Sequence, residues 1–202
     1  MSFVFFVHEV LMPSGLVSWV INCSLGLFVY FKNRASALNR FFAIFALSVG
    51  CWSVGSSLEN LIVDEYLALY VLRLCYISAS FLPTLFLHFS LVLTQRSVTR
   101  NALKLGYLLS SMFAILTFTP IFIPRLRVIE PYGFRISEPG PAYYAFFIFF
   151  VACLMSGLWI MRQSMQVMEG SQRRQMQYII LSHLIALSAG IEYFSRGDRI
   201  IS

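Results

Sequence analysis

Hydrophobic positions along the chain are gathered into six long runs that short polar stretches separate. The runs cover residues 15–31, 41–58, 66–94, 105–123, 142–161 and 178–194. Each is close to the roughly 20 apolar residues that a helix needs to cross about 30 Å of hydrocarbon. The runs lack the alternating pattern of a membrane β-barrel, so helices are the expected spanning elements. The pattern therefore predicts an all-α polytopic membrane bundle, with six transmembrane helices in a single domain over residues 1–202.

Composition agrees with a membrane environment. Hydrophobic residues make up 58% of the chain and charged residues 12%, whereas about a quarter of a typical soluble domain is charged. No Lys or Arg precedes Lys32, so the first run lacks the positive region of a cleavable signal peptide and should remain as a span. The four cysteines lie singly in apolar runs without CxxC spacing. We expect them to be small buried side chains, not disulfides or metal ligands.

The charged residues behind the net charge of +6 are distributed unevenly among the polar loops. The first, third and fifth polar loops are basic, whereas the other loops carry most of the acids. The basic clusters are Lys32, Arg34 and Arg40, then Arg96, Arg100 and Lys104, then Arg162, Arg173 and Arg174. By the positive-inside rule these loops are cytoplasmic and the N-terminus lies outside. We therefore predict a multi-pass protein of the inner (plasma) membrane, and no nucleic-acid partner is expected because topology accounts for the basic charge.

The longest polar loop, between the fourth and fifth runs, has a strand-like pattern. Leu126 to Val128 and Phe134 to Ile136 each alternate apolar side chains with arginine. Between them, "EPYG" places Pro and Gly where a type I turn accepts them. We predict a small extracytoplasmic hairpin with its turn centred on Pro131 and Tyr132; an irregular proline-rich loop is the alternative.

The third run contains polar residues inside an apolar segment. It covers about 29 residues, or roughly 43 Å as a helix, which exceeds the hydrocarbon thickness. At about 100° per residue, one face carries the polar stripe Arg73, Tyr76, Ser80, Thr84 and His88. Facing lipid, these groups would be unsatisfied, so we expect them to point into the bundle, with a kink at Pro83. Ionisable groups inside a membrane are candidates for ligand binding or signal coupling; snorkelling of the charged side chains to the membrane surfaces is the alternative.

Other runs offer polar partners for this stripe. In the sixth run Ser188 and Glu192 share a face, and Glu192 lies at a depth comparable to that of Arg73. An Arg73–Glu192 pair is therefore geometrically possible. In the second run Trp52 and Glu59 share a face that could complete a polar and aromatic pocket, with bundle packing as the alternative. Trp52, Ser188 and Glu192 thus join the stripe as candidate ligand-binding or signal-coupling residues.

Several segments occur in an order that points to one family. They are "NRFFAIFALSVGCW" with Trp52, an acidic loop, "LRLCYISASFLPTLFLHFSL" with Arg73 and Tyr76, "GFRISEPGP", and "RRQMQYIILSHLI". This order resembles the N-terminal seven-transmembrane sensor region of bacterial histidine kinases. The resemblance implies a membrane input module of a two-component system, whose cytoplasmic kinase passes phosphate to a response regulator. The signal would be a small molecule or a state of the membrane.

The chain departs from that family in its number of spans, six instead of seven. With the N-terminus outside, six spans leave the C-terminus outside as well. We find no phospho-accepting histidine motif and no ATP-binding Gly-rich segment, so the chain is not expected to be an enzyme, and no catalytic residue, cofactor or metal is predicted. Kinase activity would belong to a longer parent protein, and we expect the sequence to be a fragment or a truncated form of it.

Two other functions compete with a membrane sensor. A small transporter or channel could use the polar stripe as its pathway, although we see no inverted repeat. A haem protein could use His88 and His183, which lie at similar depths, although single membrane histidines more often pack against hydroxyls. Hydrolysis is not indicated, since HExxH and GxSxG motifs do not occur. The expected partners are the lipid bilayer, an unidentified small-molecule or membrane signal, and a second copy of the chain.

Overall fold

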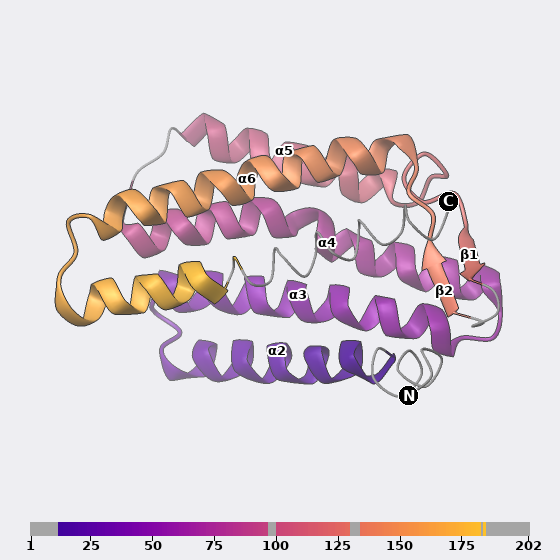
Figure 1. Cartoon of the computed structure of the whole chain (residues 1–202), viewed down its shortest axis with the longest axis horizontal. Helices are drawn as coiled ribbons and strands as arrows, with labels where there is room; N and C mark the ends of the chain where they lie inside the picture. Colours follow the sequence, from indigo (N-terminus) through magenta and orange to yellow (C-terminus); the bar gives the residue numbers. More distant parts are fainter. Residues whose placement is uncertain (1–11, 97–99, 130–133, 183, 185–202) are drawn as a thin grey trace.

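The computed structural model describes residues 12–96, 100–129, 134–182 and 184. The helices are α2 (Met12–Lys32), α3 (Ala37–Leu61), α4 (Glu65–Thr94), α5 (Arg100–Leu116) and α6 (Pro141–Met165). Strands β1 (Leu126–Ile129) and β2 (Phe134–Ser137) lie between α5 and α6, and residues 170–182 form a further helix. Figure 1 shows the helices running along one long axis with the strands at one end. The prediction of an all-α bundle is confirmed.

Among the described residues, four helices are long and apolar enough to cross a membrane, namely α2, α3, α4 and α6. They correspond to the first, second, third and fifth hydrophobic runs. The sixth run, 178–194, lies mostly outside the described residues, so the count of six spans stays a prediction. At 17 residues, α5 is about 25 Å long, which is short for a span.

The helix in the fourth hydrophobic run, 105–123, covers only part of that run, and whether it spans the membrane stays a prediction. α5 begins at Arg100 and ends at Leu116. The side-chain hydroxyls of Thr117 and Thr119 donate to the carbonyls of Ala114 and Leu116 at 2.8 and 2.7 Å, and such local bonds compete with a continuing helix. Pro120 then supplies no backbone N–H for a further helical turn. Of the apolar residues that follow, Phe122 and Ile123 pack in the core beside Tyr76 and Tyr143 instead of extending the helix.

α4 is the central helix of the bundle. It packs against α3, α5 and α6 (Figure 1), and its buried side chains extend from Ala68 to Leu91. One hydrophobic cluster surrounds the half of α4 that carries Tyr76, and a second surrounds the half that carries Phe86. The helix continues through the buried Pro83, and the kink expected there stays a prediction. The helix with the polar stripe is thus the one that touches most of the others.

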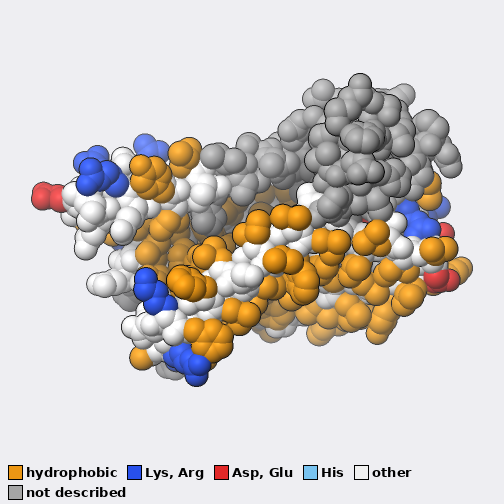
Figure 2. Space-filling model, turned by 90° about the horizontal axis from the view of Figure 1, so that it is seen from below, with side chains coloured by type: hydrophobic (Ala, Val, Ile, Leu, Met, Phe, Trp, Pro, Cys, Tyr) orange, Lys and Arg blue, Asp and Glu red, His pale blue; other side chains and the backbone are white. Residues whose placement is uncertain are grey.

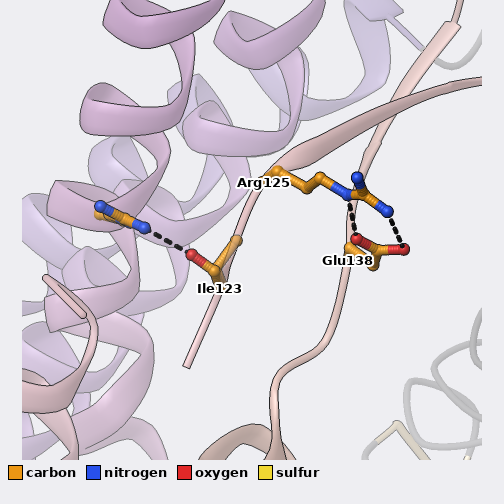
Figure 3. Close-up of polar contacts among 4 residues, drawn as sticks. Ile123, Arg125 and Glu138 are labelled. Atoms are coloured by element: carbon orange, nitrogen blue, oxygen red, sulfur yellow. Dashed lines mark hydrogen bonds and ion pairs between the residues drawn. The ribbon is translucent and has the colours of Figure 1, made fainter. Parts of the chain in front are cut away.

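The two strands form the antiparallel hairpin that the loop pattern predicted. Leu126 pairs with Ser137 and Ile129 pairs with Phe134, so the pairing is confirmed, while the predicted turn at Pro131 and Tyr132 lies outside the described residues. Beyond the last pair, Arg125 Nε donates to Glu138 Oε2 at 2.5 Å (Figure 3). This guanidinium holds the pKa of the Glu138 carboxyl below its usual range. On which side of the membrane the hairpin lies stays a prediction.

Basic side chains gather at the end of the bundle opposite the hairpin. Figure 2 shows Lys and Arg over that end, mixed charges at the hairpin end, and hydrophobic side chains over the surface between them. The α2–α3 connection, the last residues of α4, the first residues of α5 and the segment after α6 all lie at the basic end (Figure 1). The three basic loops therefore share one end, as the predicted topology requires.

The cysteines are only partly as predicted. All four are free, as expected. Cys153 is buried, but Cys51 is exposed on the bundle surface. The expectation that every cysteine is buried is wrong for Cys51, because an apolar thiol is equally compatible with a surface that faces lipid.

Candidate functional site

The polar stripe of α4 faces the interior over the middle of the helix. Ser80 and Thr84 have no exposed surface, and Tyr76 is 7% exposed. Arg73 and His88, at the two ends of the stripe, are half-buried. The predicted interior orientation is therefore confirmed for the three central residues, and the two ionisable residues lie at its margins.

Arg73 is held by backbone carbonyls. Its Nη2 donates to the carbonyl of Ile123 at 2.6 Å, and its Nη1 lies 3.4 Å from the carbonyl of Phe118; Figure 3 shows the Ile123 carbonyl accepting its bond beside the Arg125–Glu138 pair. Both carbonyls belong to the segment between α5 and β1. Arg73 therefore ties α4 to the start of the hairpin. The partner predicted from the sequence, Glu192, lies outside the described residues.

Tyr76 joins four elements at the hairpin end. Its ring centroid lies 5.8 Å from that of Phe122 and 6.1 Å from that of Tyr143 in α6, both in edge-on contact. Its hydroxyl has hydrogen-bonding neighbours in the side chains of Ser137, Tyr143 and Trp52. We call these five residues the Tyr76 cluster. The sequence offered Trp52 as part of a pocket with the stripe, with bundle packing as the alternative, and the structure brings Trp52 and Tyr76 together, with the Trp52 side chain partly exposed on the bundle surface.

The middle of the stripe contacts α5 through small polar groups. Thr84 Oγ1 and Ser110 Oγ lie 2.9 Å apart, and both residues are fully buried. Gly106 allows this close approach, because a Cβ there would lie 3.1 Å from Thr84 Cγ2 and Oγ1. Small residues with interhelical hydroxyl bonds are typical of helix contacts in membranes. Ser80 does not take part, since its hydroxyl donates to the Tyr76 carbonyl of its own helix at 2.8 Å.

His88 has protein partners on two sides. Its Nδ1 lies 2.9 Å from the Tyr107 hydroxyl of α5, and its ring centroid lies 3.9 Å from that of Phe41 in α3. This is the packing against a hydroxyl that the sequence offered as the alternative to haem ligation. The other histidine of the haem hypothesis, His183, lies outside the described residues.

The hairpin is fastened to the end of α3 by contacts that the sequence did not indicate. Asn60 Nδ2 donates to the Arg135 carbonyl at 3.2 Å, and the Arg135 amide donates to Asn60 Oδ1 at 2.7 Å. The Arg135 guanidinium donates to the carbonyls of Ile62 at 2.6 Å and Val63 at 2.9 Å, and lies 3.4 Å from that of Glu59. We call Asn60 and Arg135 the hairpin latch. A cation suits a helix C-terminus, but the sequence could not show which arginine would reach it.

Glu59 is the second residue whose position the sequence did not indicate. It is 2% exposed, and its Oε2 is buried without a hydrogen-bond partner. No ion pair of the described residues includes it. The sequence placed it on one face with Trp52 without giving it a role. Its burial beside the hairpin latch makes it part of the candidate site.

The remaining candidates are placed only in part. Ser188 and Glu192 lie outside the described residues. A surface groove between α2 and α3 is lined by Trp52 together with Ser14, Gly15, Ser18 and Ser53. Within the part of the chain that the structure describes, no three His, Cys, Asp or Glu side chains are grouped to hold a metal ion.

Comparisons with known proteins give one match. A family model described as the N-terminal 7TM region of histidine kinase matches residues 15–200. No curated protein and no solved structure matches the chain. The matched range contains the polar stripe, the Tyr76 cluster and the hairpin latch, so the candidate site lies wholly inside the region that the match covers.

Proposed function

The chain belongs to the family of N-terminal 7TM regions of histidine kinases, and from this we propose that it detects a small molecule or a membrane state and couples it to a cytoplasmic output domain. The family is the membrane-embedded, non-catalytic input region of such kinases. In this proposal the chain forms one domain of six spans in the inner membrane, with its N-terminus and hairpin outside. Signal transfer to the kinase then occurs at the basic end.

One observation carries the proposal: the buried stripe of α4 contacts different elements at its two ends. At the hairpin end, Arg73 and Tyr76 bind the segment around β1 and β2. At the other end, His88 contacts α5 and α3. A displacement of α4 that begins at the hairpin therefore also changes the contacts that α4 makes with α3 and α5 at the basic end.

The contact between α4 and α5 is suited to two arrangements of similar energy. Its polar contacts are the hydroxyl pair Thr84–Ser110 in the middle of the stripe and the His88–Tyr107 contact nearer the basic end. Hydroxyls of the same helix already bond to their own backbone, as Ser90 does to Phe86 at 2.8 Å. Thr84 could do the same after separation, so neither state would leave it unsatisfied. A ligand shifts such an equilibrium only by its difference in affinity for the two states.

A disulfide between α4 and α5 tests this coupling. Thr84→Cys and Ser110→Cys, in a full-length kinase without its native cysteines, place two thiols where the hydroxyls are 2.9 Å apart. Oxidation should change basal autophosphorylation in membrane vesicles several-fold, and reduction should restore it. The matched control is Ser18→Cys with Ser53→Cys, whose hydroxyls lie 3.0 Å apart between α2 and α3. Equal effects of the two disulfides, or no effect of either, would contradict a coupling role for α4.

The alternative of a transporter or channel requires a hydrated pathway along the stripe. Ser80 and Thr84 have no exposed surface, and their hydroxyls are bonded to protein atoms. These observations support the sensory proposal. Transport would be indicated if a cysteine at Ser80 reacted with a small water-soluble thiol reagent added from either side.

A further inference from the structure

A buried carboxyl group lies at the hairpin end without the partner that its charge would need. Glu59 is 2% exposed, and its Oε2 has no hydrogen-bond partner. An isolated ionised carboxylate is far more costly to bury than a neutral carboxylic acid, because the charged form loses much more hydration. The site therefore favours the protonated carboxyl group.

The guanidinium groups nearest to Glu59 form hydrogen bonds with backbone carbonyls instead of pairing with its carboxyl group. On β2, the Arg135 guanidinium donates to the backbone carbonyls of Ile62 and Val63, which directly follow α3. On α4, Arg73 donates to the Ile123 carbonyl, and Tyr76 lies within electrostatic range of Glu59. Other ionisable side chains at this end include Asp64, Glu65 and Tyr143, the Arg125–Glu138 pair, and Arg127, which is exposed on β1. The described part of α2 has no charged residue before its last one at the basic end, and among the described residues no cation forms an ion pair with Glu59.

We propose that Glu59 is a proton-binding site and that its protonation state is a signal that this module detects at the hairpin end. The inference rests on the proposed function and names the ligand class, a proton. Glu59 is two residues from the end of α3, where protons from the aqueous phase can reach it. Its immediate neighbour Asn60 is half of the hairpin latch, so its charge is placed where it can alter the docking of the hairpin.

The proposed change exchanges one proton and moves one guanidinium. When the pH rises, the Glu59 carboxyl gives its proton to water and becomes a carboxylate. Arg135 Nη1 is already 3.4 Å from the Glu59 carbonyl, so its guanidinium is the cation best placed to turn toward the new charge. It then leaves the carbonyls of Ile62 and Val63, and the hairpin is held less firmly on α3. Protonation reverses each step.

Infrared spectroscopy of the whole chain in lipid nanodiscs tests this assignment. At about pH 7 an exposed glutamate, with an ordinary pKa of about 4.3, is ionised. A band of a protonated carboxyl group should nevertheless be present in the wild type and absent in Glu59→Gln. Glu138→Gln, which removes a carboxyl on the hairpin that is paired with Arg125, is the matched control and should leave the band unchanged. The band should disappear when the pH is raised, and the fluorescence of Trp52 should change over the same pH range.

Further variants keep the result decisive. If Glu59→Gln does not fold, Glu59→Asp must shift the band or its titration, and an unchanged band overturns the assignment. A wild-type spectrum in which Glu59→Gln removes no band at about pH 7 overturns it as well. If the band titrates as expected but the output of the full-length kinase ignores pH, Glu59 is still a proton-binding site, and its role as a signal is refuted. If kinase output fails to respond to the α4–α5 disulfide, the proposed function fails while the proton site stands.

Discussion

Removing the Arg73 side chain should destabilise the bundle by an amount that separates an interior arginine from a snorkelling one. The bond from Arg73 Nη2 to the Ile123 carbonyl is 2.6 Å long, and hydrogen bonds to charged groups contribute about 1.5–3 kcal/mol. The 3.4 Å contact to Phe118 adds little, because hydrogen bonds of that length are weak. The carbonyl of Ile123, which has no exposed surface, would lose its donor.

One effect works in the opposite direction. Arg73 Nε is buried without a hydrogen-bond partner, and replacing the arginine by leucine removes that unsatisfied group, a gain of about 1 kcal/mol. We therefore expect Arg73→Leu to lower the free energy of unfolding by about 2 kcal/mol. A snorkelling arginine would contribute less than about 1 kcal/mol, as exposed charges do.

The assay is unfolding of the purified chain in mixed micelles by increasing denaturing detergent, followed by tryptophan fluorescence. Arg127→Leu is the matched control, because Arg127 lies on the exposed side of β1 and should change stability by less than about 0.5 kcal/mol. Equal stabilities for the two variants would refute the reasoning and leave snorkelling as the better account. Adding Glu192→Gln to Arg73→Leu tests the pair predicted from the sequence. That pair would be supported only if the double variant were milder than the sum of the single ones.

Other expectations can be checked by separate measurements. Gly157→Ala should lower the stability of the bundle by about 1–3 kcal/mol, because its Cβ would lie 2.6 Å from Phe86 Cε1; Ser156→Ala on the exposed face of α6 should match the wild type in the same detergent titration. The Arg125–Glu138 pair lowers the pKa of Glu138, so its stabilisation is present above the ordinary glutamate pKa and is lost as the pH falls through the lower folded-state pKa. The protection factors of the β1 amides, which correct for the intrinsic pH dependence of exchange, should accordingly fall in acid and at high salt in the wild type, but not in Glu138→Gln. Cysteines in the basic loops should be protected from an impermeant thiol reagent in intact cells, and labelling of all of them would invert the predicted topology. The positions to use are Ser36, Ser97 and Ser171.

Hydrophobic spacing predicted the long helices because each must present an apolar surface to lipid over its whole length. In the fourth run the helix ends before the apolar run does, for a physical reason. Ile121 to Ile123 are as apolar as a span, yet Phe122 and Ile123 are fully buried in the protein core beside Tyr76 and Tyr143. Composition cannot distinguish a side chain that faces lipid from one that fills a protein core. Thr117 and Pro120 end the helix, but they are two residues within a long apolar run. Hydrophobic spacing therefore did not reveal the end of the helix.

The sequence predicted which residues of the candidate site share a face of α4. It did not predict which residues of other elements they contact. The helical period placed Tyr76, Ser80 and Thr84 on one face, and lipid cannot satisfy such groups, so their burial followed. Their partners depend on how α4 packs. Neither the approach of Ser110 to Thr84 nor the backbone carbonyl that receives Arg73 could be read from spacing. Glu59 was found on a polar face, but the arginine that contacts its backbone carbonyl belongs to a hairpin far away in the sequence.

The hairpin latch has a consequence for the order in which the chain folds. Asn60 and Arg135 are 75 residues apart, and a chain is synthesised from its N-terminus. Until Arg135 has been made, the last carbonyls of α3 lack their guanidinium donor, and Asn60 lacks the backbone that it binds. The last turn of α3 therefore reaches its final form only after α4, α5 and β1 are in place. A defect in the loop "GFRIS" should accordingly appear as a late failure, in which α3 is inserted but its end is frayed.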